Sequence, residues 1–237
     1  MTARRSVKAT RQFLVGVIAS AADLRFAAAM REPPDLFELR LDCLLSIVDQ
    51  LERKMSILGS PIIITARDPR EGGAHNLSLR QRRDLLLRFL PQAKYVDVEL
   101  RSAGAFKSLL VSARKQNVRR ILSFHNFKST PSAQSLRSKA SLAKARGADI
   151  FKVACRTDSP AQLQRLLDFL ANKDARQAVA SRRRVDLPVS AMGIGKLGAI
   201  SRLLLARCGS VLNYASLQQS QVEGQPPIDL LRSALRR

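Results

Sequence analysis

Eight short segments with the composition of β-strands recur along this chain of 237 residues. Each is rich in β-branched or aromatic side chains, and helix signals fill the intervals between them. Successive segments start 23 to 37 residues apart, which leaves room for a strand, a crossover helix and two loops. The segments are 13–18, 37–42, 62–67, 95–100, 120–126, 150–155, 187–192 and 210–215. The repeat predicts parallel strands joined by helices.

Eight strand–helix units in a chain of this length fit a closed (β/α)8 TIM barrel better than an open sheet. An open, doubly wound sheet of eight parallel strands is the alternative fold. An apolar content of 46% is enough for a full-sized core, and Pro and Gly do not gather into a linker. We therefore expect a single barrel domain over residues 1–237, with a short basic tail at about residues 1–11.

Local signals place several of the intervening helices. Thr130-Pro131 and Ser159-Pro160 each predict a capping residue followed by a proline in the first helical turn. Gly147 predicts a helix C-terminus, and residues 228–235 predict a final amphipathic helix. A stripe of apolar residues at helical period is formed by Leu44, Ile47, Val48, Leu51 and Met55.

The first 22 residues allow two interpretations. They carry three Arg, one Lys and no acid, followed by the apolar run 13–18, and so resemble a signal or transit peptide. The alternative is a basic tail, a first core strand and a helix capped at Ser20. We favour the strand because the apolar run is short and the barrel needs it.

The net charge of +22 predicts a surface that attracts anions, including nucleic acid. The basic residues are scattered over expected helix faces, as at 80–83 and 182–184, and the chain has no Trp. Bases would therefore find few aromatic side chains to stack on, and specific nucleic-acid binding is not expected.

Three widely spaced cysteines and two histidines limit the chemistry further. An odd, unpaired set of cysteines suits a reducing compartment and argues against a disulfide framework or a zinc site. No apolar run reaches the ~18 residues of a membrane helix. We expect a cytoplasmic protein that needs no metal and no cofactor.

Lys152 lies in the middle of a segment that otherwise reads as a buried strand. An ammonium group removed from water must be paired or lose its proton, and a neutral lysine amine can form a Schiff base with a ketone. The alternative is a lysine whose stem packs while its ammonium group reaches the surface.

Polar side chains alternate with apolar ones along five of the expected strands, and in a barrel one of the two sets points inward. The polar sets are Glu38, Arg40 and Asp42; Thr65 and Arg67; Asp97 and Glu99; Ser123 and His125; and Lys152. Their charges can compensate one another in one buried cluster at the rim where barrel enzymes place catalytic groups. An internal ion-pair network without chemistry is the alternative.

Gly193, Gly195 and Gly198 match the dinucleotide-binding pattern G-x-G-x-x-G. Only 39 residues follow Gly198, too few for the rest of such a domain. In a barrel we expect this loop to hold a substrate anion on its backbone N–H groups, with Arg202 one turn into the next helix.

Motifs along nearly the whole chain resemble type I 3-dehydroquinate dehydratase and follow that family's order. They are ELRLD (38–42), TARDPREGG (65–73), VDVE (96–99), SFHNF (123–127) with TP (130–131), GADIFK (147–152), GKLGAISR (195–202) and GQ (224–225). The resemblance implies a (β/α)8 barrel that converts 3-dehydroquinate to 3-dehydroshikimate and water in aromatic amino-acid biosynthesis. It also implies a homodimer.

The resemblance assigns a role to each motif residue. Lys152 would form the imine, His125 would act as base and then acid, and Glu71 would orient His125. The remaining residues would bind the substrate: Glu38, Arg40 and Arg67 its hydroxyl groups, and Arg202 and Gln225 its carboxylate.

Two departures from the family pattern affect the substrate lid. Gln221 stands where the family usually has a serine, and the neighbouring Ser220 is a candidate substitute. The loop from Gly193 to Arg202 is about two residues longer than usual. Two other functions stay open, a Schiff-base aldolase on the same barrel and a basic polyanion-binding protein without activity.

Overall fold

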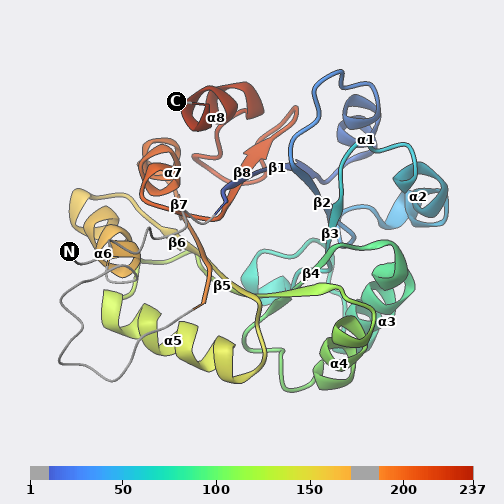
Figure 1. The fold of residues 1–237 in the computed structure, drawn as a ribbon, viewed down its shortest axis with the longest axis horizontal. Helices are drawn as coiled ribbons and strands as arrows, with labels where there is room; N and C mark the ends of the chain where they lie inside the picture. The colour runs from blue at the N-terminus through green and yellow to red at the C-terminus, as the bar shows by residue number, and fades with distance from the viewer. Residues whose placement is uncertain (1–10, 172–186, 237) are drawn as a thin grey trace, which may run out of the picture.

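A computed structural model describes residues 11–171 and 187–236. Its eight strands are all parallel and form one sheet in the order β7-β6-β5-β4-β3-β2-β1-β8, surrounded by helices (Figure 1). The strands are β1 Phe13–Ile18, β2 Leu36–Arg40, β3 Ile62–Thr65, β4 Tyr95–Glu99, β5 Arg119–Asn126, β6 Ile150–Arg156, β7 Val189–Ile194 and β8 Leu212–Ser216. All eight predicted strands are present, so the barrel prediction is confirmed.

The α-helices alternate with the strands. They are α1 Ala21–Ala28, α2 Val48–Met55, α3 Leu79–Phe89, α4 Lys107–Lys115, α5 Ala133–Ala145, α6 Pro160–Ala171, α7 Gly198–Arg207 and α8 Ile228–Leu235. Short 3-10 turns lie at η1 Leu45–Ile47, η2 Pro69–Glu71 and η3 Leu90–Gln92. None of the helices in the described ranges is both long and apolar enough to span a bilayer.

The barrel closes between β7 and β8, the two ends of the sheet order, without a regular ladder among the described residues. The Val211 amide donates to the Val189 carbonyl at 3.0 Å. The Ser210 hydroxyl accepts from the Ala191 amide at 3.1 Å, and the Ser190 hydroxyl donates to the Leu212 carbonyl at 2.6 Å. Serine side chains therefore supply part of the hydrogen bonding at this seam, as satisfaction of buried backbone groups requires.

Residues 13–18 form a strand, as expected. β1 pairs with β2 on one side and with β8 on the other. Ser20 caps α1 by accepting from the Asp23 amide at 3.0 Å. Most of the predicted basic tail (1–10) and the basic run 182–184 lie outside the described residues.

One of the two predicted proline caps is wrong. Pro160 begins α6 as expected, but α5 begins at Ala133 and is capped by Ser132, whose hydroxyl accepts from the Ser135 amide at 3.2 Å. The hydroxyl of Thr130 is used elsewhere, because it donates to the Arg156 carbonyl and ties the loop after β5 to β6.

Two apolar layers enclose the strands. The outer layer between sheet and helices includes Phe37, Leu39 and Phe151. The inner layer fills the barrel with residues such as Val17 and Ile121. Phe37 and Leu39 alternate with Glu38 and Arg40 along β2, so the predicted division into apolar outward and polar inward faces is confirmed.

Arg82 corrects the expectation that residues 80–83 lie on a solvated helix face. Its side chain is only 2% exposed and reaches from α3 toward the barrel. Its guanidinium binds the Ala66 carbonyl at 2.9 Å, Asp68 at 3.1 Å, and Glu99. A helix residue therefore compensates acids that the strands place in the interior.

We predict that Arg82→Leu lowers the free energy of unfolding by about 3 kcal/mol, because it removes one of the two guanidinium groups that compensate the buried carboxylate of Glu99. Arg83→Leu is the matched control, since the Arg83 side chain is 41% exposed and, among the described residues, forms an ion pair only with Asp84. The control should change stability by less than about 0.5 kcal/mol. Urea unfolding of both variants measures the difference, and equal effects would contradict the buried role of Arg82.

Candidate active site

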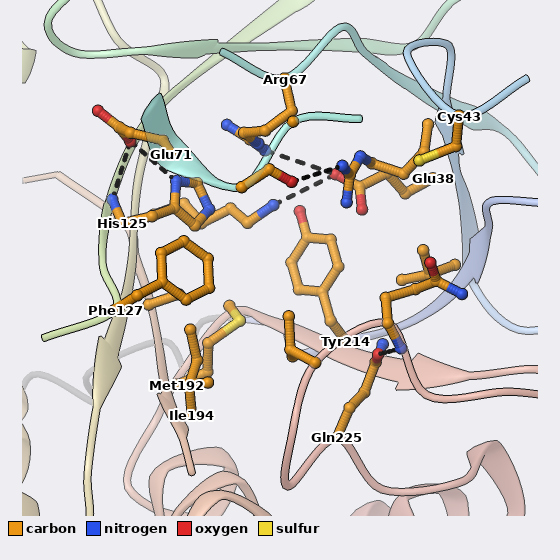
Figure 2. A pocket seen from close by; sticks show the side chains of 18 of the residues that line it. Glu38, Cys43, Arg67, Glu71, His125, Phe127, Met192, Ile194, Tyr214 and Gln225 are labelled. Carbon is orange, nitrogen blue, oxygen red and sulfur yellow. Dashed lines mark hydrogen bonds and ion pairs between the residues drawn. The ribbon is translucent and has the colours of Figure 1, made fainter. Parts of the chain in front are cut away.

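A cavity of about 260 Å³ opens at the C-terminal ends of the strands (Figure 2). All eight residues predicted for the site line it: Glu38, Arg40, Arg67, Glu71, His125, Lys152, Arg202 and Gln225. They come from β2, β5, β6, α7 and the segments that follow β3 and β8. The parallel strands bring them together because strands of one direction end at the same rim.

Lys152 lies inside the barrel, with only 4% of its side chain exposed. Its Nζ lies 2.9 Å from Asp97 Oδ2 and 3.2 Å from Glu38 Oε1. It also lies 4.0 Å from the centroid of the Tyr214 ring. The side chain does not reach bulk solvent, so the surface-lysine alternative is wrong. Two carboxylates of the predicted cluster, Asp97 and Glu38, offset the cost of burying the ammonium.

Arg67 connects the acids around this lysine. Its guanidinium binds Asp97 through two bonds of 3.1 and 3.0 Å, and Glu99 at 3.0 Å. Burial opposes a charge on Asp97, but Arg67 and Lys152 outweigh it and lower the pKa of Asp97 below its usual range. The predicted cluster of compensating charges is therefore present.

The predicted cluster is divided in two. Arg40 binds Asp42 through bonds of 3.0 and 2.7 Å and the Gly72 carbonyl at 3.2 Å. Asp42 also accepts from the Arg67 and Ala74 amides, at 3.1 and 2.9 Å. This pair thus holds the loop after β3 at the rim, while Glu38 joins the inner cluster.

His125 and Glu71 form a second buried pair. Glu71 Oε2 lies 3.0 Å from both the Nδ1 and the backbone nitrogen of His125. Burial, with the charge of Glu99, raises the pKa of Glu71 to about 7. Burial, Arg67 and Lys152 lower the pKa of His125 well below its ordinary value. The contact has the geometry of an ion pair. The raised pKa of Glu71 and the lowered pKa of His125 nevertheless both favour an uncharged pair, because burial disfavours the charged form of each group.

Arg202 is a buried cation without an acidic partner among the described residues. It is 5% exposed, and it donates to the Gly193 carbonyl at 3.1 Å and the Tyr214 carbonyl at 2.9 Å. Burial lowers its pKa to about 10. A guanidinium held this way favours an anion in the cavity, since a planar carboxylate can bind it with two hydrogen bonds.

The glycine-rich loop does not have the free amides that an anion site needs. The amide of Gly195 donates to the Glu223 carbonyl at 3.0 Å and that of Lys196 to Asp158 at 2.9 Å. The Leu197 amide donates to the Thr157 carbonyl at 3.0 Å and the Gly198 amide to the Gly195 carbonyl at 2.8 Å. The backbone part of the anion-loop prediction is therefore wrong, and Arg202 alone keeps that role.

The segment after β8 covers the cavity. Gly224 packs so closely on Gly198 that a Cβ added to either would lie within 2.7 Å of the other's Cα. Gln225 Oε1 accepts from the Gln221 amide at 2.8 Å, while the Ser220 hydroxyl donates to the Gln225 carbonyl at 3.0 Å. Gln221 lines the cavity and Ser220 does not.

Sequence reasoning missed Tyr214, Phe127, Met192 and Ile194 in the cavity wall. Tyr214 lies on β8 in a segment recognised as a strand, but a lone aromatic residue in a strand gives no sign that it faces a site. Among the described residues, no group of three or more His, Cys, Asp or Glu is arranged to hold a metal ion.

We predict that Glu71→Gln makes the protein more stable, relative to the unsubstituted chain, as the pH rises. Because the folded-state pKa of Glu71 is raised, its contribution to stability is full below about pH 4.5 and is lost as the pH passes about 7. The glutamine of the variant does not titrate. The unfolding free energy of the variant minus that of the unsubstituted chain should therefore increase by on the order of 1 kcal/mol from about pH 5 to about pH 8. Urea unfolding at both pH values tests this, and a constant difference would contradict it.

Comparisons with known proteins agree with the geometry. A family model described as type I 3-dehydroquinase matches residues 14–237. The 3-dehydroquinate dehydratase of Shouchella clausii (strain KSM-K16) is 36% identical over 233 residues, covering 94% of this chain and 88% of the relative.

Solved structures extend the likeness to three dimensions. The crystal structure of 3-dehydroquinate dehydratase from Geobacillus kaustophilus HTA426 matches with a TM-score of 0.81 at 30% identity, covering 96% of this chain and 91% of that one. The Aquifex aeolicus VF5 enzyme matches with a TM-score of 0.76 at 27% identity, covering 94% and 97%. This chain belongs to the type I 3-dehydroquinase family.

Proposed function

We propose that this protein is a hydro-lyase that converts 3-dehydroquinate to 3-dehydroshikimate and water through an imine on Lys152. One observation carries the proposal: a lysine amine removed from solvent faces the same cavity as an imidazole held by a carboxylate. Such a pair can form an imine and then move a proton beside it.

The chemistry follows from these two side chains. The Lys152 ammonium loses a proton, and the neutral amine attacks the ketone carbon. The carbonyl oxygen then leaves as water with two of the hydrogens that the ammonium carried, and a protonated imine remains. The resulting imine withdraws electrons, so the neighbouring C–H bond becomes acidic enough for a weak base such as an imidazole to remove the proton. The low pKa of His125 keeps the imidazole neutral and able to accept that proton. The imidazolium then protonates the leaving hydroxyl, and hydrolysis frees the lysine.

The other residues would bind the substrate. Arg202 would take the carboxylate, supported by its lack of an acidic partner among the described residues, and Gln225 would assist from the lid. Glu38, Arg40 and Arg67 would bind hydroxyl groups, since all three line the cavity. The guanidinium of Arg67 already binds several acids, so we expect it chiefly to hold those acids in place.

Neither alternative function is favoured by the described residues that line the cavity. A Schiff-base aldolase needs a site for the phosphate of its substrate, and the expected loop amides donate to other acceptors. A polyanion-binding protein needs no buried lysine beside a histidine. We place the enzyme in the cytoplasm, supported by three free cysteines, and propose a homodimer on the family resemblance, which sedimentation would test.

We predict that Lys152→Ala abolishes the adduct that borohydride traps with 3-dehydroquinate and nearly all turnover. His125→Ala should leave an imine that accumulates, because only the proton transfer is removed. Lys139→Ala is the matched control, since Lys139 on α5 also lies over an aromatic ring, that of Phe124 at 4.3 Å, but lies outside the cavity. Mass spectrometry of the trapped protein decides; a Lys152→Ala variant with full activity would end the proposal.

Arg202→Ala should raise KM by about tenfold to hundredfold with a smaller effect on kcat, because a charge-assisted hydrogen bond to the carboxylate is lost. Arg207→Ala, on the exposed end of α7, is the control and should leave KM unchanged. Circular dichroism checks that both variants fold. An unchanged KM in Arg202→Ala would remove this residue from the carboxylate site.

A further inference from the structure

Tyr214 contributes to the cavity a polar atom that has no partner in the described part of the chain. The residue lies on β8 and is 3% exposed. Its hydroxyl is buried and makes no hydrogen bond within the described residues, the only such side chain among those that line this cavity. Buried polar groups are nearly always satisfied, so this hydroxyl points to a state of the site in which a partner is present.

The neighbours of Tyr214 identify that state. Lys152 Nζ lies over the ring at 4.0 Å, a distance at which the ring face attracts a cation. Figure 2 shows the hydroxyl directed toward the side of the cavity that holds Glu38 and Arg67. Burial and the charges of Glu38 and Asp97 raise the pKa of Tyr214, so the hydroxyl keeps its hydrogen and can donate it.

In the free enzyme the Lys152 ammonium serves two acceptors, Asp97 and Glu38, at 2.9 and 3.2 Å. The two carboxylates depend on it to different degrees. Asp97 also receives two hydrogen bonds from Arg67 and one from Ser123. From the described residues Glu38 receives one other hydrogen bond, donated by Thr65 at 2.8 Å, and its nearest Arg67 nitrogen is 4.0 Å away.

Imine formation removes hydrogens from this nitrogen. The ammonium carries three; two leave with the ketone oxygen as water while the C–N double bond forms, and one stays on the protonated imine. One hydrogen cannot serve both acceptors. The shorter contact, to Asp97, is the one expected to persist, so Glu38 loses its cationic donor.

We propose that Tyr214 is a positioning residue that donates its hydroxyl hydrogen to Glu38 once Lys152 has become an imine. The inference rests on the function proposed above. The hydrogen bond exists in the imine and not in the free enzyme, so it lowers the energy of the imine relative to the starting state. It also keeps the Glu38 carboxylate in place beside the bound substrate.

Tyr214→Phe tests this, because it removes the hydroxyl and keeps the ring under Lys152. The amount of borohydride-trapped Lys152 adduct at short times with 3-dehydroquinate, measured by mass spectrometry, should fall about tenfold, as should kcat/KM. The melting temperature of the free enzyme should stay the same or rise, since a buried hydroxyl without a partner is removed. A merely structural tyrosine would not give this combination.

Tyr95→Phe is the matched control. Tyr95 is the other tyrosine of the chain, its hydroxyl accepts from Arg119 at 3.1 Å, and it does not line the cavity. This variant should trap as much adduct as the unsubstituted enzyme.

Two results would overturn the inference. Equal trapping by Tyr214→Phe and the unsubstituted enzyme would show that the hydroxyl does not stabilise the imine. A clear drop in the melting temperature of Tyr214→Phe would show that the hydroxyl already has a partner in the free enzyme. If the unsubstituted enzyme gives no Lys152 adduct, the proposed function itself fails. The first two results would leave the proposed function standing and reject only the role of Tyr214.

Discussion

The ion pairs between Arg67 and the acids of β4 are the interaction on which the site depends. Asp97 and Glu99 lie on the inward face of a buried strand and would be too costly to ionise there alone. Arg67 binds both, and Arg82 reaches in from α3 to the second. With these charges compensated, Asp97 has a remaining oxygen contact for Lys152 at 2.9 Å. The position of the Lys152 amine is thus a consequence of how the barrel compensates its buried carboxylates.

The same ion pairs make the two ends of the cavity electrostatically different. Lys152 and Arg67 are surrounded by carboxylates, while Arg202 is held only by backbone carbonyls among the described residues. An anionic ligand therefore finds one guanidinium whose charge is not already offset. A ligand carboxylate there would direct a ring ketone toward the amine. Burial, together with the positive charges of Arg67 and Lys152, lowers the pKa of His125 and so favours the neutral imidazole.

The alternation of side-chain directions along β-strands allowed most of the site residues to be predicted from the sequence. Because side chains on a strand point to opposite faces, Glu38 and Arg40 could be assigned inward from the sequence, and parallel strands then bring such residues to one rim. Contacts made by helices and loops could not be assigned this way. Arg82 lies among other basic residues on α3, and only packing shows which of them points inward. The amides of the loop at Gly195 are satisfied by Asp158, Thr157 and Glu223, which lie far away in sequence. Thr130 likewise does not cap α5, because its hydroxyl donates to the Arg156 carbonyl on β6.

A crystal structure of the adduct trapped by borohydride with 3-dehydroquinate tests the account most directly. The account predicts a covalent bond from Lys152 Nζ to the former ketone carbon, with the ligand carboxylate bound by the Arg202 guanidinium and the His125 ring beside the adjacent carbon. A carboxylate bound at the opposite side of the cavity, or a bond to a different lysine, would contradict it.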